Sequence, residues 1–263
     1  MKGVTIVLHS IKSKGGKRMN PIAVSPCSNP ELTLEAALAA YSRIGYRKFE
    51  LFTSWTQSAV DVTADPEIYA RLAAAYGIEY VSMHLPPIKD EREESLERVV
   101  QAAAFAVQLG IGIVLFKAQT RELYIRMAKA FLDAIEGLDI VPVLQNHAGS
   151  AIASLDDYRE VIRGIGDRRM KTLLEVGHFH SVGVSWQAGF ELLGDSIALI
   201  HIKDQIGSQS VAFGSGEIDL QGLFRQMRTA GYTGHFVVEM EVKDKENTLA
   251  YLAAALQHIQ PWV

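Results

Sequence analysis

Apolar and polar positions follow one arrangement again and again along the chain. In each copy, apolar residues recur three or four positions apart in a stretch that is often alanine-rich, a glycine follows, and a short apolar run comes next. The first spacing is typical of an amphipathic helix, and the short run is typical of a buried strand. The seven copies read AAYSRIGYRKFELF, LAAAYGIEYVSMH, AVQLGIGIVLFK, AIEGLDIVPVLQNH, IRGIGDRRMKTLLE, LLGDSIALIHIKD and RTAGYTGHFVVEME.

A glycine stands where each predicted helix ends, a place that favours the left-handed conformation glycine tolerates best. With a first strand over Ile22 to Ser25, the seven copies give eight strands alternating with helices. This order predicts an α/β fold, a (βα)8 TIM barrel in a single domain. The alternative is a doubly wound open sheet, which favours a glycine-rich turn after the first strand. PIAVSPCSNPELT contains no glycine, so the barrel is favoured. The junction glycines are Gly45, Gly77, Gly110, Gly137, Gly166, Gly194 and Gly231.

The start of the chain differs from the repeats. Residues 1–19 are basic and carry only a short apolar run, Val4 to Leu8, which is too short for a signal-peptide core. We therefore expect residues 1–19 to form a loose extension and residues 20–263 to form the catalytic barrel domain. Met1 and Met19 both stay open as the natural start.

Composition narrows the class of protein. The 263 residues are 48% hydrophobic and 21% charged, as in a globular protein with a large core. A net charge of -4 argues against nucleic acid as a partner and favours a small polar metabolite. A single cysteine, Cys27, permits no internal disulfide and indicates a reducing, cytoplasmic setting. No stretch approaches the roughly 18 apolar residues of a membrane span. A homo-oligomer is possible, but no segment identifies an interface.

Ionisable and amide side chains collect at the predicted C-terminal ends of the strands, where (βα)8 barrels carry their chemistry. A lone histidine at such a place is more often a structural residue. Seven consecutive strands with polar ends would cost much desolvation unless they form a pocket, so we predict one. The residues are Glu50, Ser82, His84, Lys117, Gln145, His147, Glu175, His178, His201, Lys203, Glu239 and Glu241.

Three of these residues suggest a metal site. Glu175, His201 and Glu239 end adjacent predicted strands. Carboxylate and imidazole ligands suit one divalent ion such as Mn²⁺, Mg²⁺, Co²⁺ or Zn²⁺. An ionic network without metal is the alternative that spacing alone leaves open.

Five motifs in order make the chain resemble the sugar phosphate isomerase/epimerase family, the xylose isomerase-like TIM barrels. They are SMHLPP, LQNHAG, LLEVGH, HIKD followed by FGSGEID, and GYTGHFVVEME. The resemblance implies a divalent metal held by Gln145, Glu175, His201 and Glu239. It also implies that His178 contacts a substrate hydroxyl and that His84 and His147 line the same pocket. We further expect Glu50, Lys117 and Glu241 to contact the substrate.

Two residues depart from the family pattern. Glu175 stands where an aspartate is usual, and Gln145 stands where the family has a glutamate. Relatives with two glutamates use them as paired acid and base, and an amide cannot carry a proton at neutral pH. We therefore predict a one-base site, in which Glu239 abstracts a proton beside a carbonyl. His147, His178 or Lys203 would then return it or protonate a leaving hydroxyl.

The predicted activity is that of a metal-dependent isomerase or epimerase of carbohydrate metabolism, acting on a small keto-sugar or sugar phosphate. The alternatives are a dehydratase or lyase of inosose or dehydroshikimate type, and a sugar-binding protein that lost catalysis with Gln145. An endonuclease of the same barrel type is disfavoured because strand four ends in Lys117 rather than a histidine. FGSGEID could bind phosphate or could simply precede a helix capped by Asp219, and we favour the cap.

Overall fold

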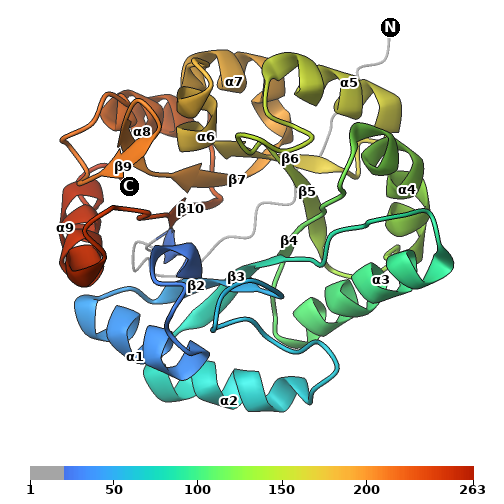
Figure 1. Ribbon diagram of the computed structural model, residues 1–263, viewed down its shortest axis with the longest axis horizontal. Coiled ribbons are helices and arrows are strands. Elements are labelled where there is room, and N and C mark those ends of the chain that lie inside the picture. Colours follow the sequence, from blue (N-terminus) through green and yellow to red (C-terminus); the bar gives the residue numbers. More distant parts are fainter. Residues whose placement is uncertain (1–20) are drawn as a thin grey trace, which may run out of the picture.

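Eight parallel strands close into a barrel in the computed structural model, which describes residues 21–263 (Figure 1). Around the ring the order is β1, β10, β7, β6, β5, β4, β3 and β2. The predicted TIM barrel is confirmed, whereas the predicted extension over 1–19 falls outside the described residues. The barrel strands are β1 (Ile22–Val24), β2 (Lys48–Phe52), β3 (Glu79–His84), β4 (Ile113–Leu115), β5 (Val141–Gln145), β6 (Lys171–Glu175), β7 (Ile197–Ile202) and β10 (His235–Val238).

Helices surround the strands on the outside of the ring (Figure 1). Several begin at a side chain that accepts a hydrogen bond from the first turn, such as Thr33, Thr120 and Ser154, because the first backbone N–H groups of a helix have no partner within it. The helices are α1 (Leu34–Ile44), α2 (Pro66–Tyr76), α3 (Glu93–Gln108), α4 (Arg121–Ala134), α5 (Leu155–Ile165), α6 (Val176–Ser181), α7 (Trp186–Leu193), α8 (Leu220–Thr229) and α9 (Thr248–Ile259), with 3-10 turns η1 (Pro26–Ser28), η2 (Gly194–Ser196) and η3 (Lys245–Asn247).

The junction glycines behave as the sequence predicts in their backbone angles. All seven have positive φ. Gly45, Gly77 and Gly166 are themselves left-handed C-caps, while Gly110 and Gly231 stand one residue beyond the cap. Gly194 has positive φ but a ψ of -127°, because the chain passes there directly into a 3-10 turn.

A small apolar layer fills the inside of the barrel. It contains one residue from each of seven strands: Ala23, Val81, Leu115, Val143, Leu173, Leu199 and Val237. Strand side chains alternate between faces, so the residue two positions further on points to the same side. Two positions beyond five of these apolar residues stand Lys117, Gln145, Glu175, His201 and Glu239. The fold therefore places these polar side chains just above the apolar layer, at the C-terminal mouth of the barrel.

Two elements at this mouth were not predicted. Helix α6 follows β6 directly, with Glu175 as its N-cap. Strands β8 (Asp204–Ile206) and β9 (Gln209–Val211) form an antiparallel hairpin after β7, outside the barrel sheet. Both are too short to show a helical or alternating pattern in the sequence.

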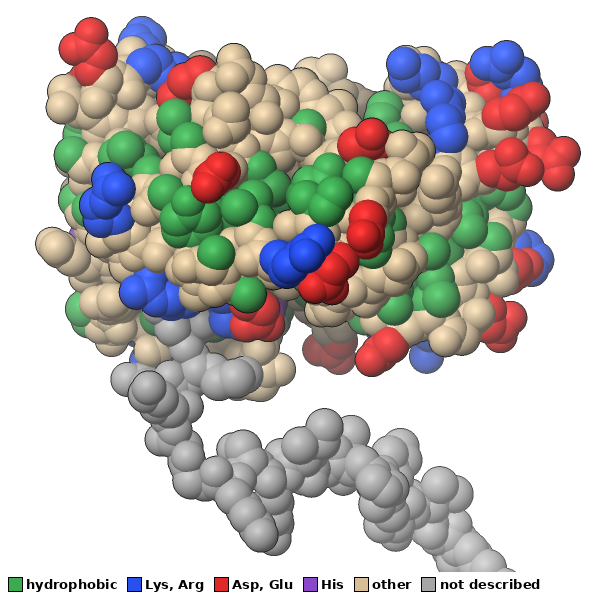
Figure 2. Space-filling model, turned by 90° about the horizontal axis from the view of Figure 1, so that it is seen from below, with side chains coloured by type: hydrophobic (Ala, Val, Ile, Leu, Met, Phe, Trp, Pro, Cys, Tyr) green, Lys and Arg blue, Asp and Glu red, His purple; other side chains and the backbone are tan. Residues whose placement is uncertain are grey.

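The outer surface carries charges of both signs. Seen from the side of α1 and α2, it shows Lys and Arg side chains mixed with Asp and Glu side chains and apolar ones (Figure 2). On this face the mixed charges form no continuous basic stripe. Among residues 21–263, no helix has the length and apolar character needed to cross a membrane.

Candidate active site

Three buried side chains meet at one point of the mouth. Nδ1 of His201 lies 3.3 Å from Oε2 of Glu175 and 3.1 Å from Oε1 of Glu239. Within the described part of the chain, His201 Nδ1 and Glu175 Oε2 have no hydrogen-bond partner. Buried polar atoms nearly always make a hydrogen bond, so two atoms that face each other and Glu239 only at ion-pair distances need an explanation. One nitrogen and two carboxylate oxygens form a donor set that fits a divalent ion.

The Glu175 carboxylate is held in place by the helix that it caps. Its Oε1 accepts hydrogen bonds from the backbone N–H groups of Gly177 at 2.9 Å and His178 at 3.4 Å. Asn146 exchanges two hydrogen bonds with the Glu175 backbone, at 2.9 and 3.0 Å. Glutamate, with its longer arm than aspartate, can thus cap α6 with one oxygen and direct the other toward His201.

Glu50 lies behind His201 and is fully buried. Its Oε1 is 3.0 Å from His201 Nε2 and accepts from Ser82 Oγ at 2.8 Å, while its Oε2 is 3.1 Å from His84 Nε2. Burial opposes ionisation, but His201 and His84 outweigh it and hold the pKa of Glu50 below its ordinary value. The carboxylate thus fixes His201 with Nε2 protonated and Nδ1 directed at Glu175 and Glu239. Its predicted contact with substrate stays a prediction.

Lys203 supplies a buried positive charge beside Glu239. Its Nζ forms an ion pair with Glu239 Oε2 at 2.7 Å, donates a hydrogen bond to Glu241 Oε2 at 2.8 Å, and lies 4.0 Å from Glu175 Oε1. Burial opposes the ammonium, but these carboxylates outweigh it and raise the pKa of Lys203 above its ordinary value. Lys203 and His201 likewise hold the pKa of Glu239 well below its ordinary value against the effect of burial. Glu239 is therefore ionised at neutral pH.

Gly177 leaves the space through which the Lys203 side chain passes. A Cβ added at Gly177 would lie 2.2 Å from Lys203 Cγ and 2.5 Å from Cδ. We expect Gly177→Ala to lower the free energy of unfolding by roughly 1–3 kcal/mol in denaturant titration, because overpacking displaces buried groups. Gly112→Ala is the matched control, since a Cβ there meets nothing within 4 Å. Equal stability of the two variants would show that Lys203 moves aside without cost.

His84 and Lys117 extend the network to the opposite side of the mouth. Lys117 Nζ lies 2.6 Å from His84 Nδ1. Burial, followed by the Lys117 charge, lowers the pKa of His84 to about 4, against the opposing effect of Glu50. The His84 ring is therefore neutral, accepting from Lys117 at Nδ1 and donating to Glu50 at Nε2.

His147 and His178 lie together beside the carboxylates. Their ring centroids are 3.8 Å apart, and His147 Nδ1 is 2.8 Å from the Ala148 carbonyl oxygen. Burial, then the charge of Lys203, lowers the pKa of His178 to about 2, so this ring is neutral.

Gln145 is buried on β5, next to β6, and its amide makes no hydrogen bond to another described residue. His180, on the same helix as His178, pairs with Glu217 at 3.0 Å.

The glycine-rich segment after β7 is occupied by a side chain of the protein itself. Asp204 is buried, and its carboxylate accepts from the backbone N–H groups of Gly214 at 2.8 Å, Gly216 at 2.9 Å and Ile218 at 3.4 Å. Asp219 caps α8 by accepting from Gly222 N. The segment is therefore folded around a carboxylate, which agrees with the structural interpretation of FGSGEID.

Two other groups of potential ligands are less suited to a metal. Glu50, His84 and His201 could share an ion, but both Glu50 oxygens already accept hydrogen bonds from the imidazoles. Cys27 lies near Glu239 and Glu241, but burial, reinforced by those carboxylates, raises the pKa of its thiol well above its ordinary value. A thiol in this state is a poor ligand.

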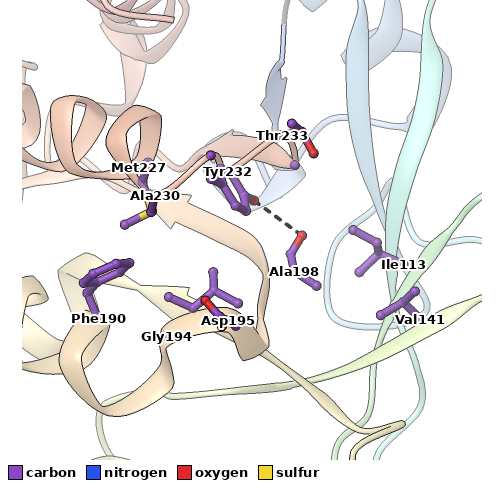
Figure 3. A pocket seen from close by; sticks show the side chains of 13 residues that line it. Ile113, Val141, Phe190, Gly194, Asp195, Ala198, Met227, Ala230, Tyr232 and Thr233 are labelled. Carbon is purple, nitrogen blue, oxygen red and sulfur yellow. Dashed lines mark hydrogen bonds between the residues drawn. The ribbon is translucent and has the colours of Figure 1, made fainter. Parts of the chain in front are cut away.

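A cavity of about 440 Å³ lies at the other end of the barrel (Figure 3). Ile113, Val141 and Ile197, which line it, are the first residues of their strands. The Tyr232 hydroxyl there is 3.4 Å from the Ala198 carbonyl oxygen, and Asp195 is the one carboxylate among its lining residues in the described chain. The N-terminal end of barrel strands is generally structural, so the chemistry belongs to the mouth.

A family model described as xylose isomerase-like TIM barrel matches residues 38–262 of the chain. The chain belongs to this family. None of the curated protein sequences compared with it matches.

Several solved structures share the fold of this chain. The chain has a TM-score of 0.75 and 15% identity to 3-keto-D-glucoside 4-epimerase from E. coli, with 92% of this chain and 99% of that chain covered. The values for D-psicose 3-epimerase in the presence of D-fructose are 0.75 and 11%, with the same coverage. For the IolI protein with a bound zinc atom they are 0.74 and 14%, covering 93% and 99%. Because the identities are this low, these matches establish a shared fold and nothing more.

Ion pairs and hydrogen bonds join most of the predicted site residues into one network. Glu50, His84, Lys117, Glu175, His201, Lys203, Glu239 and Glu241 are linked by contacts of 4.0 Å or less. Sequence reasoning gave no role to Asn146 or Asp204, although both stand in the quoted motifs. Their partners are backbone groups, which a pattern of side-chain types does not identify.

Proposed function

We propose that this protein is a metal-dependent isomerase or epimerase that removes a proton from the carbon beside the carbonyl of a small keto-sugar. The observation that carries the proposal is the meeting of Glu239 with His201 Nδ1 and Glu175 Oε2, two buried atoms that make no hydrogen bond within the described chain. Membership of the family supports it, as do the sugar epimerases among proteins of the same fold.

Four residues would hold the ion. Glu175, His201 and Glu239 offer the buried ligand atoms, and Gln145 could add its amide oxygen from β5. A bound divalent ion would polarise the substrate carbonyl and so make the neighbouring C–H group more acidic. An amide in place of a carboxylate leaves the set with two negative ligands instead of three, which weakens binding.

Glu239 is the base in this proposal. Lys203 holds its Oε2 at 2.7 Å and keeps the carboxylate ionised and oriented, ready to accept a proton. His178, neutral and beside His147, can exchange hydrogen bonds with a substrate hydroxyl through a ring nitrogen. Glu241, whose side chain is 43% exposed, reaches from Lys203 toward solvent and can accept from a hydroxyl at the rim.

An unphosphorylated sugar suits the mouth better than a sugar phosphate. The backbone N–H groups of Gly214, Gly216 and Ile218, which would cradle a phosphate, are bonded to Asp204. A phosphate dianion would have to displace a buried carboxylate from these partners.

The proposal is tested by incubating the protein, loaded with Mn²⁺, Co²⁺ or Zn²⁺, with D-fructose and D-tagatose and separating the products by chromatography. We expect an epimer or aldose isomer that a chelator abolishes. Loss of water from the sugar, detected as an unsaturated or deoxy product, would instead establish the lyase alternative. Turnover unchanged by chelation would contradict a metal-dependent reaction.

Gln145→Glu distinguishes the proposed enzyme from a sugar-binding protein that lost catalysis. We expect the wild-type protein to be active. The variant should bind Mn²⁺ about tenfold more tightly in calorimetry, a gain of about 1.4 kcal/mol in binding free energy, because a carboxylate replaces a neutral ligand. An inactive wild-type protein that gains turnover in the variant would identify a decayed enzyme.

A further inference from the structure

Lys117 stands across the barrel from the proposed base. It follows β4, and β4 lies four strands from β10 in either direction around the ring (Figure 1). Glu239 comes directly after β10. Both residues stand two positions beyond an apolar residue of the inner layer, so both point into the mouth. A substrate between them would meet Glu239 on one side and Lys117 on the other.

The surroundings of Lys117 suit proton donation. Its Nζ contacts the neutral His84 ring at 2.6 Å, and the residue is partly exposed at the mouth. The groups that face it are His84 from β3, Glu50 from β2, Glu239 after β10, and Cys27 of η1. Burial lowers the pKa of Lys117 below its ordinary value, although these acidic groups oppose the shift. An amine of this kind gives up its proton more readily than an exposed lysine.

Lys203 is the weaker candidate for the same role. It follows β7, which pairs with β10, so it lies on the same side of the mouth as Glu239. Carboxylates of Glu239 and Glu241 hold its Nζ at 2.7 and 2.8 Å, and they stabilise the charged ammonium. A proton from Lys203 would return to the face from which Glu239 removed one.

We propose that Lys117 is the catalytic acid on the substrate face opposite Glu239, where it performs the proton transfer that the amide of Gln145 cannot. The inference rests on the proposed function. The Glu239 carboxylate takes the proton from the carbon beside the carbonyl, and the C–H electron pair moves into the resulting enolate. The Lys117 ammonium then protonates the same carbon from the other face, which inverts it. Glu239 is left as the acid and Lys117 as the amine, and exchange of protons with water restores both charges.

The test follows two events on D-fructose in D₂O by NMR, at saturating Mn²⁺. One is exchange of the hydrogen at C3, which needs Glu239, and the other is formation of the C3 epimer, which also needs Lys117. We expect Lys117→Met and Lys117→Arg to lower epimer formation at least 100-fold while exchange stays within a few-fold of wild type. Arginine keeps the positive charge but holds its proton too tightly to donate it. Lys129→Arg, on the exposed face of α4, is the control.

Other outcomes distinguish failure of the inference about Lys117 from failure of the proposed function. Normal epimer formation in Lys117→Arg, or a raised KM with unchanged kcat in Lys117→Met, would mean that Lys117 only binds substrate, and this overturns the inference. Wild-type protein that binds Mn²⁺ but catalyses neither exchange nor inversion of D-fructose or D-tagatose would overturn the proposed function and this inference with it.

A second readout needs no substrate. Competitive acetylation followed by peptide mass spectrometry reports the pH at which each amine becomes reactive. We expect half-reaction of Lys117 at a lower pH than that of the exposed Lys129. Equal values for both lysines would overturn the inference.

Discussion

We expect Glu239→Gln to lower the rate of hydrogen exchange and of epimer formation by about 10²–10⁴-fold, the contribution of a positioned general base. The amide keeps the size of the side chain but cannot accept the proton from carbon. Both rates fall together, because this carboxylate acts in the first step, which both reactions share. The measurement is NMR of D-fructose in D₂O at saturating Mn²⁺, so that weaker metal binding by the variant does not limit the rate.

Glu79→Gln is the control for this change. Glu79 begins β3, at the other end of the barrel, and pairs with Lys48 at 3.0 Å. The same chemical change there should leave both rates within about twofold, since exposed ion pairs contribute little. Retention of exchange in Glu239→Gln would assign the base to another residue and contradict the one-base mechanism.

We expect Glu50→Gln to weaken binding of Mn²⁺ or Zn²⁺ by about 10–100-fold, the usual effect of losing a partner that orients a ligand histidine. Glu50 accepts from His201, His84 and Ser82. An amide has a single acceptor oxygen, and its NH₂ group would face a ring N–H or a hydroxyl. His201 then loses the contact that directs Nδ1 toward Glu175 and Glu239. Calorimetric titration of chelator-stripped protein measures the change.

Ser82→Ala provides the comparison for Glu50. It removes the 2.8 Å hydrogen bond to the same carboxylate but leaves both imidazole contacts. We expect a loss of about 0.5–1.5 kcal/mol in the free energy of unfolding and little change in metal affinity. If Glu50→Gln bound metal as tightly as Ser82→Ala, Glu50 would have no role in orienting His201.

The barrel could be predicted because its signals are local. Each βα unit repeats one hydrophobic pattern and one glycine, and backbone sterics require the glycine at positive φ. Helix α6 and the β8–β9 hairpin escaped prediction for the opposite reason. They are short, and side chains such as Glu175 and Asp204 accept hydrogen bonds from backbone N–H groups there, which a hydrophobic pattern does not reveal.

The sequence predicts which residues gather at the mouth of the barrel, but it does not predict what each of them contacts. Alternation along strands and their order around the barrel place Lys117, Gln145 and Glu239 at one mouth. Sequence gives no information on which carboxylate faces which histidine. For Glu50 the sequence predicts a substrate contact, which stays a prediction, but it does not predict the contacts with His84 and His201 that the structure shows. Lys117 and Lys203 look alike in sequence, and only their partners, an imidazole for one and carboxylates for the other, distinguish them.

Metal content tests most directly whether Glu175, His201 and Glu239 form a divalent-metal site. The protein is purified without chelator and analysed by elemental mass spectrometry, and the stripped form is titrated with Mn²⁺, Co²⁺ and Zn²⁺. We expect close to one equivalent per chain, lost in Glu239→Ala. Absence of metal together with no measurable binding of any of the three ions would contradict the metal-dependent mechanism and favour a metal-free sugar-binding protein.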